Sequence, residues 1–151
     1  MFVYLVHHGV AVEPLVDPQR PLSSRGRGDV ERLAADAAAR GAKPQVVWHS
    51  GKLRARQTAE AFWRACNPLA DLTAVRGLQP ADPPEWMRDQ LAGESRDVLI
   101  AGHFPHLPGL LRLLTAGHED ATTGFPKHGM VALEATEAGY AERWRLHPAA
   151  E

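Results

Sequence analysis

Two short apolar runs in this 151-residue chain end at histidines. The first run covers residues 2–6 and is followed by His7 and His8; the second covers residues 98–101 and is followed, after one glycine, by His103. Unbroken apolar runs of this length are typical of strands buried on both faces, in a sheet covered by helices. Ligands of open α/β sheets bind beyond the carboxyl ends of the strands. We therefore expect chemistry where these histidines lie.

Helical and strand patterns alternate along the rest of the chain. The apolar spacing from residue 24 predicts a helix that Gly41 ends, and two late strands joined around Gly139 indicate a hairpin. The alternation predicts an α/β fold, a three-layer α/β/α sandwich with a mostly parallel central sheet and a late antiparallel strand, in one domain over residues 1–151. The other predicted elements are strands at 46–48, 72–75, 130–134 and 141–146 and helices at 52–66, 84–91 and 108–116.

Charge and cysteine content exclude several classes of protein. The formal net charge of -1 provides no basic field for nucleic acid and no polybasic patch for a membrane surface. The lone Cys66 cannot form an internal disulfide, which suits a reducing compartment. The N-terminal apolar run is too short for a membrane span and lacks the basic leader of a signal peptide. We expect a cytoplasmic globular domain.

A basic segment follows the predicted strand at residues 46–48. Because a helix begins within two residues of Ser50, free backbone N–H groups and the positive end of the helix dipole lie beside the strand terminus. Arg54 falls in the first turn of this helix and can reach back over the edge of the sheet. These features favour an anion site. The alternative is an exposed basic helix start, since lysine and arginine are common there.

Three motifs resemble those of one enzyme family. Residues 5–9, Leu-Val-His-His-Gly, are similar to the strand-end motif Leu-x-Arg-His-Gly of the histidine phosphatase superfamily, the phosphoglycerate-mutase-like group. Residues 50–59 resemble its Ser-x-x-x-Arg-Ala-x-Gln-Thr-Ala motif at every specified position, and residues 102–103 match its late Gly-His. The resemblance implies a phosphoglycerate-mutase-like arrangement of the predicted sheet.

Within the family, the chain resembles the compact SixA-type phosphohistidine phosphatases, through Arg20-Pro21-Leu22-Ser23 and its short length. The resemblance implies that His8 is the nucleophile and that His103 is its partner at the phosphate. It also implies that Arg20 and Arg54 bind phosphate oxygens. Phosphoryl transfer to nitrogen needs a neutral imidazole, and a backbone carbonyl near the strand end would select the tautomer. Arginine forks and a second histidine suit the spread negative charge.

His7 departs from the family pattern, which has arginine immediately before the nucleophile. A histidine at the phosphate offers one donor and is charged only when protonated, so the exchange is not conservative. Losing a charged hydrogen bond to a buried phosphate costs about 1.5 to 3 kcal/mol, or one to two powers of ten in rate or affinity. We therefore expect attenuated activity with His7 as a phosphate ligand. Its protonation would give turnover an acidic optimum, because acid also disables His8.

The general acid has no clear candidate. Many relatives use a glutamate after the middle motif, in a stretch that here offers Gly77 or Gln79 instead. A phosphohistidine has a weaker bond than an ordinary phosphomonoester and suits a site without a dedicated acid. Asp17 is a possible donor, although an aspartate beside Pro18 is typical of a turn.

No metal site is predicted, and no cofactor. His103 and His106 have a spacing that metal ligands use, but nearby prolines interrupt the helix that would aim them together, so His106 is expected at the rim. The other histidines give no signal, apart from a possible approach of His128 to the pocket from a loop. These are His49, His118, His128 and His147.

The sequence therefore favours a metal-independent phosphatase that works through a phosphohistidine on His8. Its expected substrate is a phosphorylated histidine in a protein of the histidine-phosphotransfer type, because no insertion is long enough to form a lid. Two alternatives remain. The first is a weakened module that binds phosphate or a phosphoprotein, in view of His7 and the missing acid, and the second is a hydrolase of small phosphomonoesters.

Overall fold

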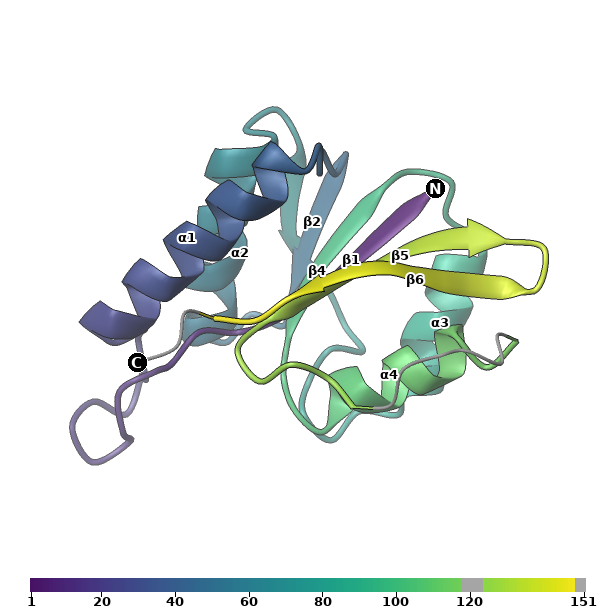
Figure 1. The fold of residues 1–151 in the computed structure, drawn as a ribbon. Coiled ribbons are helices and arrows are strands. Elements are labelled where there is room, and N and C mark those ends of the chain that lie inside the picture. Colours follow the sequence, from purple (N-terminus) through teal and green to yellow (C-terminus); the bar gives the residue numbers. More distant parts are fainter. Residues whose placement is uncertain (118–123, 149–151) are drawn as a thin grey trace.

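The computed structural model describes residues 1–117 and 124–148. Within these ranges, strands and helices alternate as the sequence predicts (Figure 1). In chain order they are β1 (Phe2–His7), α1 (Ser24–Ala39), β2 (Val46–His49), α2 (Leu53–Cys66), β3 (Asp71–Ala74), α3 (Pro84–Ala92), β4 (Val98–Gly102), α4 (His106–Leu114), β5 (Met130–Thr136) and β6 (Gly139–Leu146).

One sheet holds all of these strands, in the order β3-β2-β4-β1-β5-β6. The pairs β3–β2, β2–β4 and β4–β1 are parallel, whereas β5 is antiparallel to both β1 and β6. This arrangement confirms the α/β class, the mostly parallel sheet and the late antiparallel strand. Because β1 lies between β4 and β5, residues that follow β1 have neighbours on both sides.

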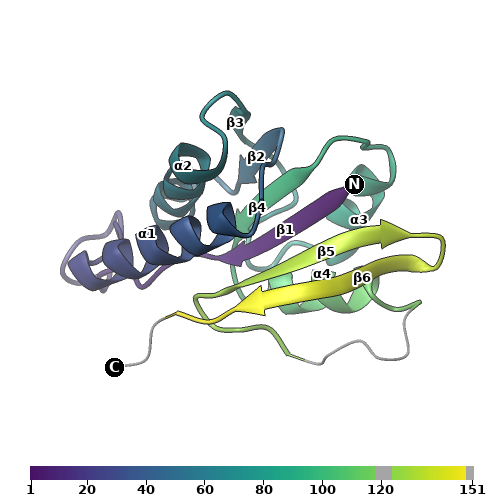
Figure 2. The same cartoon turned by 45° about the horizontal axis from the view of Figure 1, so that its top comes forward.

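Helices cover both faces of the sheet, which gives three layers. α1 and α2 lie on one face, and α3 and α4 lie on the other (Figures 1 and 2). In β1, Tyr4 and Val6 join the core beneath α1 and α2, whereas Val3 and Leu5 join the core beneath α3 and α4. Successive side chains of a strand point to opposite faces, so both must be apolar when both faces are covered. That requirement explains the unbroken apolar run.

The N-termini of α1 and α4 lie close to the segments that follow β1 and β4. Ser23 caps α1 by accepting a hydrogen bond from the N–H of Gly26, and a Cβ added to Gly26 would lie 2.1 Å from the carbonyl oxygen of Val10. Only glycine allows α1 to approach the loop after β1 this closely. α4 begins at His106 rather than at residue 108, so His106 is buried and not at the rim as expected. No helix among the described residues has the length and apolarity needed to cross a membrane.

Candidate active site

Neighbouring parallel strands bring His8 and His103 together. β1 and β4 pair with His7 opposite Gly102, so the two histidines follow at the same level of the sheet. The N–H of His8 donates to the carbonyl of Gly102 at 3.1 Å. The two imidazole centroids are 5.2 Å apart and both residues are buried. The residues implied as nucleophile and partner therefore lie side by side.

The ring of His8 is held with one nitrogen available. Its Nδ1 lies 2.7 Å from the carbonyl oxygen of Gly9, which can only accept, so Nδ1 carries the proton and Nε2 keeps its lone pair. Burial lowers the pKa of His8 to about 4, against the opposing effect of the Gly9 carbonyl. At neutral pH the imidazole is therefore uncharged, which is the state that a nitrogen nucleophile needs.

Ser50 contacts the ring of His103. Its Oγ lies 2.6 Å from Nε2 of His103 and accepts the backbone N–H of Lys52 at 3.3 Å. When the hydroxyl donates to Nε2, the ring proton of His103 is on Nδ1. Nδ1 is buried and has no hydrogen-bond partner among the described residues. Burial, followed by the neighbouring His8, lowers the pKa of His103 to about 3. The sequence analysis missed this positioning role of Ser50.

Arg54 brings a guanidinium to the same place from the first turn of α2. Its Nε is buried and has no partner among the described residues. Burial, with a smaller contribution from Arg20, lowers the pKa of Arg54. Two guanidinium groups that repel one another, one with an unsatisfied donor, are stabilised by an anion that binds both.

Arg20 approaches from the loop between β1 and α1. Its Nε donates to the carbonyl of Val12 at 3.1 Å, and its backbone has a φ of 50°, in the left-handed region that residues other than glycine seldom adopt. Such a conformation costs of order 1–3 kcal/mol and persists where the surroundings fix it. The loop is closed at its base by a bridge between Ala11 and Leu22.

The remaining residues of the middle motif tie these pieces to α2. Gln57 accepts the N–H of Leu22 at 2.8 Å, at the base of the loop that carries Arg20. Thr58 accepts the N–H of Gly9 at 3.1 Å, next to the nucleophile. A Cβ on Gly9 would lie 2.5 Å from a methyl group of Val30, so α1 also requires glycine there. α2 thus supplies Arg54 and also anchors the segments that carry His8 and Arg20.

His7 lies beside His8 within a stack of rings. By the alternation of β1 it belongs to the face of Leu5, and its ring is stacked between Phe104, at 4.1 Å, and His128, at 4.6 Å. Its Nδ1 accepts the backbone N–H of His128 at 2.7 Å, so in the neutral ring the proton is on Nε2. Burial, followed by the neighbouring His8, lowers the pKa of His7 to about 2. This environment speaks against the expected acidic optimum, because His7 stays uncharged well below pH 5.

A cavity of about 410 Å³ opens beside these histidines. We call it the His8 cavity. Its lining includes residues of β1 and the following loop that the sequence predicts at the site, and residues that it does not. Lys127 and Glu13 match no motif, and His128 is predicted only as a possible approach from a loop. Its lining is His7, His8, Val10, Ala11, Glu13, Arg20, Phe104, Lys127 and His128.

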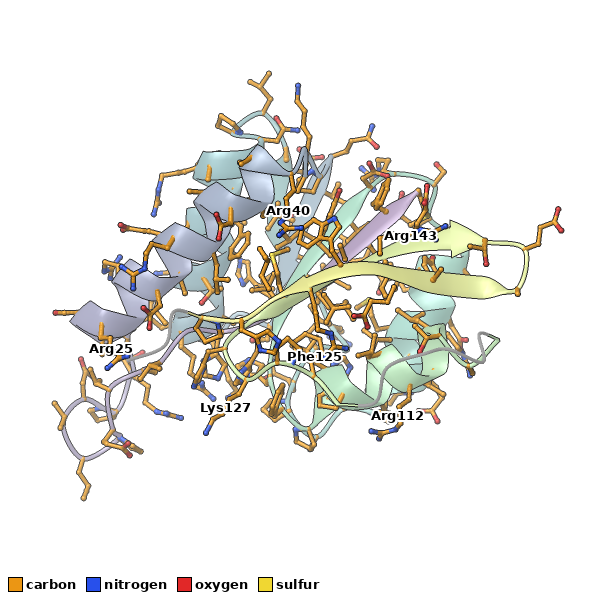
Figure 3. The ribbon with its side chains drawn as sticks, in the orientation of Figure 1. Arg25, Arg40, Arg112, Phe125, Lys127 and Arg143 are labelled. Atoms are coloured by element: carbon orange, nitrogen blue, oxygen red, sulfur yellow. The ribbon has the colours of Figure 1, made fainter. Side chains whose placement is uncertain are left out.

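Lys127 and His128 reach the His8 cavity from the segment before β5. His128 has a φ of 56° and lies 2.7 Å through Nδ1 from the carbonyl oxygen of His8. In Figure 3 the labelled Lys127 lies near the end of the sheet at which β1 stops and the loop to α1 begins. Nothing in a single sequence marks this segment, because it joins the site only through antiparallel pairing of β5 with β1.

Asp17 is placed in a turn. Its carboxylate accepts the N–H of Gln19 at 2.9 Å, and Asp17 is not among the residues that line the His8 cavity. Gln79, one of the two positions at which the family resemblance leads us to expect the acid, donates from Nε2 to the carbonyl of Ser50 at 2.8 Å. It therefore supports the Ser50 turn and has no proton to give. Among the residues that line the His8 cavity, Glu13 is the one carboxylic acid.

The other histidines are not part of this arrangement. His106 is buried at the start of α4, where burial lowers its pKa against the opposing charge of Asp82. His49 accepts the N–H of Gly51 in the turn after β2. His147 is exposed, and His118 lies outside the described residues.

Solved structures share this fold over almost the whole chain. One, assigned as the phosphohistidine phosphatase SixA from Agrobacterium tumefaciens, has 25% sequence identity and a TM-score of 0.81, with 97% of each chain covered. The protein histidine phosphatase SixA complexed with tungstate has 22% identity and a TM-score of 0.84, with 98% of this chain and 97% of that chain covered. A phosphoglycerate mutase from Bacillus anthracis has 12% identity and a TM-score of 0.72, with 95% and 91% covered.

Sequence comparison identifies the family. A search of curated proteins finds no match. The model of the histidine phosphatase superfamily (branch 1) matches residues 3–97, a stretch that contains His8, Arg20 and Arg54. The fold shared with the SixA structures and with phosphoglycerate mutase agrees with this match. The chain belongs to the histidine phosphatase superfamily, branch 1.

Proposed function

We propose that the protein is a metal-independent phosphatase that removes phosphate from a phosphorylated histidine in a partner protein, through a phosphohistidine intermediate on His8. Membership of the superfamily supports phosphatase chemistry. The likeness to a structure assigned as the phosphohistidine phosphatase SixA supports the choice of phosphohistidine. A cytoplasmic location fits such a substrate and the single free Cys66.

The observation that carries this proposal is the match between one free lone pair and two unsatisfied donors. Nε2 of His8 is unprotonated, because Nδ1 donates to Gly9. Beside it, Nε of Arg54 and Nδ1 of His103 are buried without partners among the described residues. An unsatisfied buried donor costs about 1–3 kcal/mol, which is recovered when the side chains close around a phosphoryl group. A phosphoryl group also presents the electrophile to Nε2.

The reaction proceeds in two displacements. In the first, the Nε2 lone pair of His8 forms a bond to phosphorus while the P–N bond of the substrate breaks, and the electron pair of that bond leaves with the substrate imidazole. In the second, a water oxygen bonds to phosphorus, and the bond to Nε2 breaks with return of its electrons to His8. Arg54, Arg20 and His103 hold the oxygens throughout and stabilise their charge.

The lack of an acid at residues 77 and 79 favours phosphohistidine over a phosphomonoester. An alkoxide leaving group needs a proton, but a departing imidazole is neutral when its other ring nitrogen is already protonated. Position 77 is glycine, and Gln79 is engaged with Ser50. Glu13 lines the His8 cavity and is exposed, in a position to help water attack in the second step.

Exposed apolar side chains around the site favour a protein as the substrate. Leu15 and Val16, on the loop that carries Arg20, are 102% and 77% exposed. Trp86 is 58% exposed and lines a second cavity of about 400 Å³ that also contains Ser50. Large apolar residues left in solvent near a site are characteristic of surfaces that contact other proteins.

The test compares two substrates. A phosphorylated histidine-phosphotransfer domain and an aryl phosphate are incubated with wild-type protein, with His8→Ala and with His147→Ala, in the presence of a chelator. We expect turnover of the phosphodomain by wild type and by His147→Ala, loss of turnover in His8→Ala, and weak or no cleavage of the aryl phosphate. Faster cleavage of the aryl phosphate would instead support a phosphomonoester hydrolase.

A second candidate function is a phosphate-binding module without turnover. It is favoured by the neutral, stacked His7 where the family has arginine. Calorimetric binding of the phosphodomain to wild-type protein, with no phosphate released from either substrate, would support this function and overturn the phosphatase.

A further inference from the structure

Three histidine rings meet at the wall of the His8 cavity. His7 and His8 lie at the carboxyl end of β1, and His128 comes from the segment before β5. One ring nitrogen of each lies within 4.8 Å of those of the other two. This cluster depends on the residue at position 7, because arginine there offers no ligand atom for a metal.

Two of the three rings already have the tautomer of a metal ligand. Nδ1 of His8 donates to the carbonyl of Gly9, and Nδ1 of His128 lies 2.7 Å from the carbonyl of His8, to which it can only donate. In its neutral form each ring therefore keeps the Nε2 lone pair. Histidines that bind metals commonly donate their other ring N–H to a backbone carbonyl or a carboxylate, which fixes the tautomer and the orientation of the ring.

The third ring, His7, must change its tautomer to bind. Its Nδ1 now accepts the N–H of His128, so Nε2 carries the proton that ligation displaces. The ring is stacked on His128 with an interplanar angle of 12°, and the two rings must tilt toward one another. Nitrogen atoms that share a tetrahedral Zn²⁺ at about 2.0–2.1 Å lie roughly 3.3 Å apart, so nitrogens separated by the 4.8 Å limit have to approach by about 1.5 Å.

We propose that the His8 cavity binds a divalent late transition-metal ion such as Zn²⁺ through His7, His8 and His128, and that the ion blocks the enzyme. Imidazole nitrogens suit Zn²⁺. Glu13 in the same cavity supplies a carboxylate, whereas Arg20 and Lys127 oppose the positive charge. The block follows because the ion occupies the lone pair of His8, and that part alone rests on the proposed function.

Metal binding is tested without reference to activity. Co²⁺ is titrated into tag-free protein at pH 7, and the visible absorption of tetrahedral Co²⁺ is recorded, followed by displacement with Zn²⁺. We expect saturation at one equivalent for wild type and for the control His147→Ala, whose histidine is exposed. His128→Ala and His7→Arg are each expected to lower the affinity at least about 10-fold, because each removes one ligand.

The comparison of variants decides the proposal. The absence of a stoichiometric Co²⁺ signal in wild type would overturn it, as would equal affinities in wild type, His128→Ala and His7→Arg. Circular dichroism confirms that each variant is folded, and His7→Arg restores the residue of the family pattern if His128→Ala does not fold. Failure of the phosphatase assay leaves this test intact, since the absorption reports binding alone. Where the assay succeeds, Zn²⁺ should inhibit wild type more strongly than His7→Arg.

Discussion

The two sides of His8 are built on opposite principles. On the side of α2, Arg54 and His103 present donors that lack partners, and Ser50 orients one of them. On the side of β5, His7 and His128 form a stack in which Nδ1 of each ring is paired with the backbone. The first side suits a bound anion, and the second suits a bound metal ion. The difference teaches that two adjacent histidines at the end of one strand can line the same cavity and still have different partners, because His8 bonds to its neighbour Gly9 whereas His7 bonds to the distant His128.

The largest expected effect comes from removing charge on the α2 side. In Arg54→Met the phosphoryl group loses a charged donor in a partly buried site, so kcat/KM for the phosphodomain should fall by about 10²–10³-fold, the range found when one preorganised donor to a developing charge is lost. Steady-state kinetics measure it, with the exposed Arg56→Met on the same helix as the control. A loss of less than threefold would remove Arg54 from the phosphate site.

A smaller effect, in the opposite direction, is expected on the β5 side. His7→Arg adds a fixed charge and a second donor, so kcat/KM should rise by about 10–100-fold, in line with about 1.5–3 kcal/mol for a charged hydrogen bond. The same assay measures the gain, and thermal unfolding shows whether the longer side chain is accommodated against Phe104. Unchanged kinetics in a folded variant would show that position 7 does not reach the phosphate.

Ser50→Ala should reduce kcat by about tenfold or less, because it removes one hydrogen bond worth about 0.5–1.5 kcal/mol. The ring of His103 then loses its partner at Nε2. We expect KM to change little and Ser50→Thr, which keeps the hydroxyl, to recover most of the rate. A loss in KM with kcat intact would contradict a positioning role.

The smallest effect concerns pH. Burial lowers the pKa of His8 to about 4, below the ordinary 6.5, so the nucleophile is neutral above that value and is protonated only as pH falls through it. Activity should therefore change less than about twofold between pH 7 and 5 and fall near pH 4. A profile of kcat/KM in constant ionic strength measures this. A rise toward pH 5 would restore the idea that His7 gains charge there.

Much of the fold follows from local sequence. The unbroken apolar run of β1 predicts a strand between two helical layers, and the strand ends predict which edge of the sheet carries His8 and His103. The carbonyl that fixes His8 was expected near the strand end and is that of Gly9. The start of α4 and the burial of His106 were missed, because prolines at 105 and 108 suggest a later start and are tolerated in its first turn.

The rest of the site depends on contacts between distant segments. Ser50 bonds to His103 across 53 positions, and His128 bonds to His7 across 121. Such pairings follow from strand order and register, which no local pattern encodes. Asp17 illustrates the reverse case: its turn geometry was the open alternative to an acid, and the structure places it in the turn.

Two hydrogen bonds from α2 fix both ends of the loop after β1, so the part between them can be exchanged as a unit. Gln57 holds its far end at Leu22 and Thr58 holds its near end at Gly9, while the bridge between Ala11 and Leu22 closes the base. The tip, residues 14–19, lies outside the lining of the His8 cavity, which Glu13 and Arg20 reach from either side of it. Grafting a tip from another member of the superfamily, with Glu13 and Arg20 retained, offers a route to redirect partner choice while the lining of the cavity is left unchanged.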